Sequence, residues 1–177
     1  MSAEPRFRRP LTRQELFCRL DELGIVTQTI DHKAVFTVAE LTGVDHELPG
    51  GHTKNLFLKD AKDNMFLVVA LSTTRVDLKL LPKVIGSARL SFGKPELLME
   101  ALGVTPGSVS AFAIANDVTR RVAVVIDRAL MSHDRVNCHP LENTATTNIA
   151  RNDLLRFIRA SGHEPQVADL GGAVATN

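Results

Sequence analysis

Apolar positions along the chain recur with two different periods, which predicts helices interspersed with β-hairpins. Thr12 and Glu15 have the spacing of a helix capping box, and leucines follow at helical intervals until Gly24. Pro95 and Gly103 bracket another helix, because proline suits the first helical position and glycine the position just past the last. The predicted helices cover residues 12–24, 37–43, 77–85 (interrupted or ended by Pro82), 95–102 and 153–161.

Short apolar runs bounded by polar turns predict the strands. The polar segments 60–64 and 116–121 each separate two such runs, as expected for hairpins. The predicted strands cover residues 25–32, 55–58, 65–71, 112–115, 122–127, 135–139, 146–150 and 166–170, with loops at 45–53 and 105–110. This order lacks the regular strand–helix alternation of a doubly wound sheet. We therefore expect an α+β fold with a mixed, largely antiparallel sheet, curved or barrel-like, surrounded by helices.

Length and composition favour one ordinary domain. The chain has 177 residues, 44% of them hydrophobic, which is enough for one core and short for two. We expect a single domain over residues 12–170, a flexible N-terminal arm at 1–11 and a frayed C-terminus at 171–177. The formal net charge of +1 creates no global field toward nucleic acid, so any contact with RNA has to be local. With eight Phe and no Trp or Tyr, the chain also has little from which to build a base-stacking platform.

The sequence shows no sign of export, of a membrane or of a cofactor. It has no secretory signal and no apolar run of membrane-spanning length, and its two cysteines, Cys18 and Cys138, do not suggest a disulfide. We expect a cytoplasmic protein. Nucleotide-binding, metalloprotease and serine-hydrolase motifs are absent, and none of the histidines has metal-ligand spacing, so we expect neither cofactor nor metal. Cys138 and His139 are neighbours in a predicted strand, where their side chains would diverge rather than form a catalytic pair.

Three segments could carry chemistry, although each also has an ordinary structural interpretation. Lys54 lies where a glycine-rich loop meets a strand, either as a solvated flanking lysine or as a cation that meets a phosphate or a carbonyl. Gly107 and Ser108 lie in a loop that is either a plain turn or a backbone that presents N–H groups to a carbonyl oxygen. His139 begins a polar segment that is either a turn with local hydrogen bonds or part of a pocket.

Taken together and in order, these segments resemble the YbaK/ProX family, which includes the editing insertion of bacterial prolyl-tRNA synthetases and its free-standing relatives. The resemblance covers residues 12–170, and it is strongest to stand-alone deacylases that clear alanine from proline tRNA. The matching stretches are Lys54-Asn55-Leu56-Phe57-Leu58 with Asp60, Arg75-Val76-Asp77-Leu78-Lys79, residues 102–110, and His139-Pro140-Leu141 with Asn143, Thr144 and Thr146. One position departs from the family, since Ala111 stands where many members have proline, and this puts the rigidity of the preceding loop in question.

The resemblance implies hydrolysis of an aminoacyl ester on tRNA, with no metal and no covalent nucleophile. It makes Lys54 the residue that binds the terminal phosphate or orients the ester, with Asn55 as a polar anchor beside it. Gly107 and Ser108 would cradle the carbonyl. His139 would line the amino-acid pocket, either as a general base or as part of the wall. Residues that would line the same pocket, or else belong to the core, are Ile30, Val35 and Phe36.

The expected function is therefore a trans-acting Ala-tRNA(Pro) deacylase in which a ribose hydroxyl helps to activate the attacking water. Proline would be excluded by size, because a missing methylene is worth only about 1–3 kcal/mol to a synthetase site and a second, smaller pocket is needed. The alternatives are a Cys-tRNA(Pro) deacylase, a non-catalytic module that binds an acceptor end or a synthetase, and a domain with a vestigial pocket. The expected partner is the tRNA acceptor end, with prolyl-tRNA synthetase or an elongation factor left open as presenters of the substrate. Candidate phosphate contacts, which are otherwise a solvated surface, are Arg6, Arg8, Arg9, Lys59, Lys62, Lys79 and Lys83.

Overall fold

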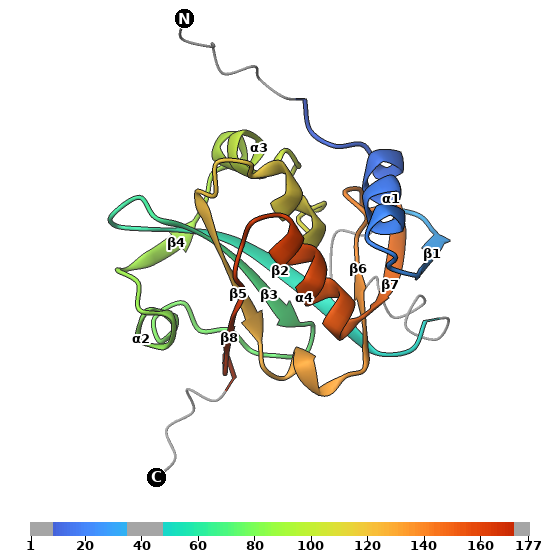
Figure 1. Cartoon of the computed structure of the whole chain (residues 1–177). Helices are drawn as coiled ribbons and strands as arrows, with labels where there is room; N and C mark the ends of the chain where they lie inside the picture. The colour runs from blue at the N-terminus through green and yellow to red at the C-terminus, as the bar shows by residue number, and fades with distance from the viewer. Residues whose placement is uncertain (1–8, 35–47, 172–177) are drawn as a thin grey trace, which may run out of the picture.

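The computed structural model describes residues 9–34 and 48–171 (Figure 1). Its helices are α1 (Arg13–Glu22), α2 (Leu81–Ile85), α3 (Pro95–Leu102) and α4 (Arg151–Ala160), with short 3-10 helices η2 (Ala111–Asn116) and η3 (Leu130–Ser132). Its strands are β1 (Thr27–Asp31), β2 (Gly51–Asp60), β3 (Met65–Leu71), β4 (Leu90–Phe92), β5 (Val122–Asp127), β6 (Arg135–Cys138), β7 (Ala145–Ala150) and β8 (Gln166–Ala168). The predicted helix at 37–43 and the pocket candidates Val35 and Phe36 lie outside the described residues, as do most of the predicted arm and C-terminus.

The strands form one curled, mixed sheet in the order β1-β7-β6-β2-β3-β5-β8, with β4 paired to β2 (Figure 1). Antiparallel pairs join β1 to β7, β7 to β6, β2 to β3 and β2 to β4. Parallel pairs join β6 to β2, β3 to β5 and β5 to β8. The expected α+β class with a mixed, curved sheet and helices around it is confirmed.

Two apolar clusters hold the central strands from opposite sides. Phe57 of β2 and Leu67 of β3 pack into the larger cluster, which also takes the buried sides of α1, α3, α4 and η2. The next residues, Leu58 and Val68, pack into the smaller cluster with α2 and the segment after β8. Because β3 is covered on both faces, its sequence is a continuous apolar run rather than an alternating one.

Several predicted elements are confirmed, and others need correction. Thr12 and Glu15 form the capping box of α1, and Gly103 ends α3 with φ of +67°. The predicted strand at 112–115 is wrong, because these residues belong to the 3-10 helix η2, whose first turn is capped by the Ser110 hydroxyl. Five consecutive buried residues give no periodicity by which helix and strand can be told apart. Pro82 does not interrupt or end a helix but lies in the first turn of the short α2, where its missing N–H costs nothing.

The edge of β2 that faces away from β3 is only partly paired. It meets β6 at Gly51 and His52 and meets β4 at residues 58–60. No described strand pairs with this edge at residues 54–56, so the sheet divides there. Gly50 makes the junction with β6 possible, because its φ is +102° and a side chain there would collide with the main-chain oxygen of Arg135.

Candidate active site

Strand pairing places Lys54 and His139 on the same face of the sheet. His52 of β2 pairs with Asn137 of β6, and paired residues share a face. Lys54 and His139 each follow two residues later, where the side chain returns to that face. We call it the site face. Helices α1, α3 and α4 pack against the opposite face, because Val136 and Cys138, which flank Asn137, belong to the larger apolar cluster.

The same register brings Ile30 to the site face. Asn148 of β7 pairs with Asn137 of β6, so Thr146, two residues earlier, also lies on this face. Ile30 of β1 pairs directly with Thr146. Two of the predicted pocket residues for which the structure gives a position, Ile30 and His139, are thus neighbours around Thr146.

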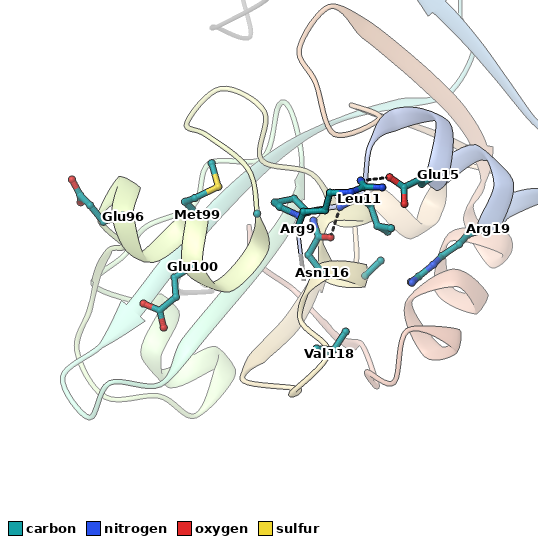
Figure 2. A pocket seen from close by; sticks show the side chains of 12 residues that line it. Arg9, Leu11, Glu15, Arg19, Glu96, Met99, Glu100, Asn116 and Val118 are labelled. Atoms are coloured by element: carbon teal, nitrogen blue, oxygen red, sulfur yellow. Dashed lines mark hydrogen bonds and ion pairs between the residues drawn. The ribbon is translucent and has the colours of Figure 1, made fainter. Parts of the chain in front are cut away.

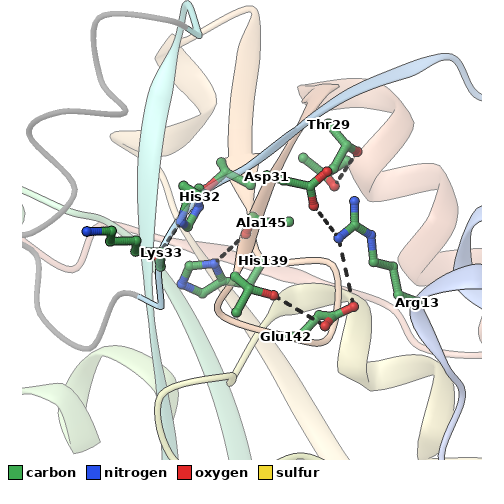
Figure 3. Close-up of polar contacts among 11 residues, drawn as sticks. Arg13, Thr29, Asp31, His32, Lys33, His139, Glu142 and Ala145 are labelled. Carbon is green, nitrogen blue, oxygen red and sulfur yellow. Dashed lines mark hydrogen bonds and ion pairs between the residues drawn. The ribbon is translucent and has the colours of Figure 1, made fainter.

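The His139 imidazole is held in one tautomer (Figure 3). Its Nδ1 lies 3.0 Å from the main-chain oxygen of Ala145, and since a carbonyl only accepts, Nδ1 carries the proton. The other nitrogen, Nε2, therefore presents a lone pair. Burial lowers the pKa of His139, an effect that the Ala145 carbonyl opposes and the nearby His32 reinforces. His139 is therefore neutral at pH 7 and can accept a hydrogen bond or a proton.

His32 is a functional candidate that sequence reasoning missed. Its ring centroid lies 6.5 Å from that of His139, and its Nε2 lies 2.8 Å from the Thr146 hydroxyl. Its Nδ1 lies 2.6 Å from the main-chain oxygen of Lys33, so both ring nitrogens have partners and the ring is fixed as a wall beside His139 (Figure 3). A histidine at the end of a predicted strand next to Ile30 was the available signal.

A buried amide network anchors the segment that leads into Lys54. Asn148 donates from its side chain to the Asn137 side-chain oxygen at 2.8 Å and to the Pro49 main-chain oxygen at 2.8 Å. Thr53 donates to the main-chain oxygen of Asn137 at 2.7 Å. Asparagines in mid-strand are the sequence signal for this network, because buried amides persist only when they are hydrogen-bonded. The network fixes the start of β2 to β6 and β7, and so fixes where Lys54 emerges.

Lys54 itself is half-buried in β2, opposite Ala70 of β3. No hydrogen bond or ion pair joins its ammonium group to any residue in the ranges 9–34 and 48–171. A half-buried cation without a protein partner can take an anionic or strongly polar ligand without first breaking a salt bridge.

The side chain of Asn55 lies on the opposite face from Lys54, because the two residues are neighbours in a strand. Its Oδ1 atom is buried without a hydrogen-bond partner among the described residues. The main chain of Asn55 is placed differently. The His52 oxygen accepts from the Ser72 N–H and the Asp60 N–H donates to the Asn64 oxygen, at the two ends of β3, so the main-chain groups of even-numbered β2 positions face β3. The N–H and C=O of Asn55 therefore point toward the opening where the sheet divides.

The loop that carries Gly107 and Ser108 is a tight turn. The Ser108 N–H donates to the Thr105 oxygen at 3.0 Å, so it is already used within the loop. Gly107 has φ of +91°, and its N–H donates to no main-chain oxygen within the described residues. Ala111, the position at which we expect proline in many family members, opens the capped helix η2, and the cap itself gives the end of the loop a fixed conformation. No hydrogen bond among the described residues joins this loop to Lys54 or His139.

Two hollows differ in how they relate to these positions. A cavity of about 10 Å³, roughly the size of one water, is lined by His52, Thr53, Asn137, Cys138, His139 and Thr146. A hollow of about 780 Å³ lies between the N-terminal segment, α1, α3 and η2 (Figure 2). Its lining carries both signs of charge, with Arg9 and Arg19 beside Glu15, Glu96 and Glu100, and it contains neither Lys54 nor His139.

Cys138 is excluded as a nucleophile, because burial raises the pKa of its thiol to about 12. Within the described residues, no three His, Cys, Asp or Glu side chains gather in a way that could hold a metal ion. Over the same residues, no helix is long and apolar enough to cross a membrane.

Comparison with known proteins gives consistent matches. The sequence model of the aminoacyl-tRNA editing domain matches residues 32–157. The prolyl-tRNA editing protein ProX of Acetoanaerobium sticklandii is 38% identical over 159 residues, covering 89% of this chain and 97% of that protein. The prolyl-tRNA synthetase associated domain-containing protein 1 of Danio rerio is 40% identical over 157 residues, covering 88% of this chain and 85% of that protein.

Among solved structures, a candidate trans-editing enzyme for prolyl-tRNA synthetase superposes with a TM-score of 0.68 at 19% identity. The alignment covers 96% of this chain and 99% of that one. At this level of identity, the likeness concerns the fold.

Proposed function

Because the chain belongs to the aminoacyl-tRNA editing domain family, we propose that it is a trans-acting deacylase that hydrolyses Ala-tRNA(Pro). The observation that carries this proposal is that Lys54, which has no hydrogen bond or ion pair to residues 9–34 or 48–171, lies on the same face of the sheet as His139, whose Nε2 presents a lone pair. The names of the relatives point to prolyl-tRNA as the substrate class.

Lys54 is the cationic anchor for the substrate. Lys54 directly precedes Asn55 in β2, beside the opening where the sheet divides and where the 3′ end of the tRNA would enter. A phosphate of the terminal nucleotide, or the ester carbonyl, would bind the Lys54 ammonium group, which has no partner among the described residues. The main-chain N–H of Asn55, which points toward the opening, is an additional donor for the ester or ribose oxygens. Gly107, whose N–H donates to no main-chain oxygen within the described residues, stays the family-based candidate for a further donor.

His139 receives a hydrogen bond from the substrate through Nε2, either from the α-ammonium group of the amino acid or from the attacking water. Water adds to the ester carbonyl carbon, its proton passes to the ribose oxygen as the C–O bond breaks, and the products are free alanine and tRNA. A neighbouring ribose hydroxyl orients the water, and the protein contributes positioning and stabilisation of the developing negative charge. Neither metal nor covalent nucleophile has a role in this scheme.

The size limit arises from the wall formed by Ile30, His32 and His139. These side chains are fixed by strand pairing and by the hydrogen bonds to Thr146 and Ala145, so the wall cannot retreat without breaking polar contacts. We propose that this wall accepts the alanine side chain and excludes the proline ring. Discrimination by exclusion can exceed the roughly 1–3 kcal/mol that a missing methylene supplies to binding.

The test is a deacylation assay on tRNA(Pro) charged separately with alanine, cysteine and proline. We expect loss of the alanyl ester and retention of the prolyl ester. Preferential loss of the cysteinyl ester would reassign the substrate, and absence of hydrolysis at high protein concentration would favour a non-catalytic tRNA-binding module. Lys54→Ala should lose activity, whereas Lys94→Ala, which removes an exposed lysine at the start of α3, should not.

A further inference from the structure

One guanidinium group spans two segments that carry the site histidines (Figure 3). Arg13 lies in the first turn of α1, and its Nη1 is 2.6 Å from the Asp31 carboxylate at the end of β1. The same Nη1 is 3.9 Å from the Glu142 carboxylate in the connection between β6 and β7. The Arg13 hydrogen bond, with its charge, lowers the pKa of Asp31. The Phe17 ring, one turn along α1, lies 5.4 Å from the guanidinium carbon and orients it.

Each of the two carboxylates is tied to a histidine of the wall. Asp31 directly precedes His32, and it pairs across the sheet with Ala145, whose oxygen holds His139. Glu142 lies three residues after His139, in the loop that returns to Ala145. Arg13 therefore links the end of β1, which carries His32, to the loop that follows His139. It does so on the face of the sheet that the helices cover.

The loop between β6 and β7 requires such an external contact. Leu141 has φ of +68°, a left-handed conformation that residues with a side chain rarely adopt and that persists only when the surroundings determine it. Leu141 packs against the larger apolar cluster, and the next residue, Glu142, is held by Arg13. The Glu142 carboxylate also accepts a hydrogen bond from Thr144 at 3.3 Å.

We propose that Arg13 is a positioning residue for the editing site, which sets the width of the amino-acid pocket by tying Asp31 to Glu142. This inference rests on the proposed function. Arg13 touches no substrate. Its loss lets the loop at 139–144 relax, the His139 ring shifts away from Ala145, and the pocket admits a larger amino acid. A displacement on the order of 1 Å at a reacting group can change rates as much as a hundredfold.

If Arg13 only stabilised the fold, Arg13→Gln would lower the thermal midpoint and leave discrimination between the esters unchanged. The positioning role predicts the reverse. The Asp31 and Glu142 carboxylates are 74% and 47% exposed, whereas the Arg13 side chain is 25% exposed, and ion pairs with solvent-exposed partners contribute little to folding. Arg13→Gln should therefore leave the thermal midpoint nearly unchanged. It should instead narrow the ratio of kcat/KM for the alanyl and prolyl esters, by roughly tenfold, mainly through a gain on the prolyl ester.

The experiment compares Arg13→Gln with Arg19→Gln, a matched change six residues further along α1, and with Glu142→Gln, which removes only the loop side of the bridge. We expect Arg13→Gln and Glu142→Gln to relax discrimination and Arg19→Gln to leave it intact. Combining the two active changes should add little to either one, because both break the same link. Wild-type discrimination in Arg13→Gln and Glu142→Gln would overturn the proposal, even if stability fell.

A second readout does not depend on catalysis. The 15N signals of the His139 ring report its tautomer and the hydrogen bond to Ala145. Arg13→Gln should shift them toward an averaged, solvent-exposed ring, and Arg19→Gln should not. If the wild-type protein hydrolyses no ester but these signals respond as expected, the proposed function fails and the positioning role stands. If the ring signals are unchanged, the positioning role fails regardless of activity.

Discussion

The imidazole rings of His32 and His139 lie 6.5 Å apart, centroid to centroid, with an angle of 55° between their planes. Each ring is hydrogen-bonded to β7. His32 contacts the Thr146 hydroxyl, and His139 donates to the main-chain oxygen of the preceding residue, Ala145. A proton on His139 would be poorly solvated and close to a second imidazole. The pair is therefore arranged to keep His139 uncharged.

The first prediction concerns pH. Burial, reinforced by His32, lowers the pKa of His139 below its ordinary value of 6.5, so deacylation should rise to its plateau with a midpoint below pH 6.5. The midpoint is read from kcat/KM against pH. In His139→Gln this acid limb should disappear together with much of the activity. A midpoint above 6.5 would contradict the assignment.

The same shift affects folding, with a definite sign. Between the lowered pKa and 6.5, the unfolded chain binds the His139 proton and the folded chain does not. The contribution of His139 to stability is therefore complete above pH 6.5 and declines as the pH falls toward the folded-state pKa. Denaturant midpoints of wild type and His139→Gln should converge over this acidic interval.

The second prediction concerns thiol reactivity. Burial raises the pKa of Cys138 to about 12, whereas Cys18 on α1 is exposed. Since the thiolate is the reactive form, alkylation of the native protein near pH 8 should label Cys18 alone. Mass spectrometry should find the second label only after unfolding. Rapid labelling of Cys138 in the native protein would show that the region behind His139 is open.

The third prediction concerns the joint between β2 and β6. Gly50→Ala adds a side chain both in a left-handed conformation and against the main chain of Arg135. Gly86→Ala is the matched control, because Gly86 has φ of +74° with nothing within 4 Å of an added carbon. We expect Gly50→Ala to cost roughly 2 kcal/mol more than Gly86→Ala in urea unfolding. Equal costs would mean that the approach of the two strands is looser than described.

The fourth prediction concerns the core beneath the site. Phe112 is fully buried, and its ring meets that of Phe157 edge-on with centroids 5.3 Å apart. Phe112→Ala should reduce the free energy of unfolding by about 3–5 kcal/mol. Phe92 on β4 is 63% exposed, and Phe92→Ala should change stability by less than about 0.5 kcal/mol. Similar losses for both variants would place the core elsewhere.

The sequence predicts much of this fold because its local signals are strong. The capping box at Thr12 marks where α1 begins, and Pro95 and Gly103 mark the start and the end of α3. Where a segment is apolar throughout, as in η2, no period remains to be read, and the strand predicted there is wrong. The three-residue strand β4 is missed because its formation depends on β2 rather than on its own sequence.

The site is predicted less completely for a related reason. Lys54 and His139 could be named from local motifs, but their common face depends on the register between β2 and β6. Nothing local to Asn55 indicates that the sheet divides beside it. The link from Arg13 to Glu142 joins residues 129 positions apart in the chain, and only the folded structure brings them together.

β2 owes its alignment to both apolar clusters. Phe57 faces one cluster and Leu58 the other, so a slip of one residue would exchange their surroundings. The same slip would turn Lys54 into the helix-covered core and Asn55 outward. The burial of Phe57 and Leu58 thus fixes on which face of the sheet Lys54 lies. The accuracy that we propose for this protein toward its substrate therefore depends on the register of β2, which the two apolar clusters hold.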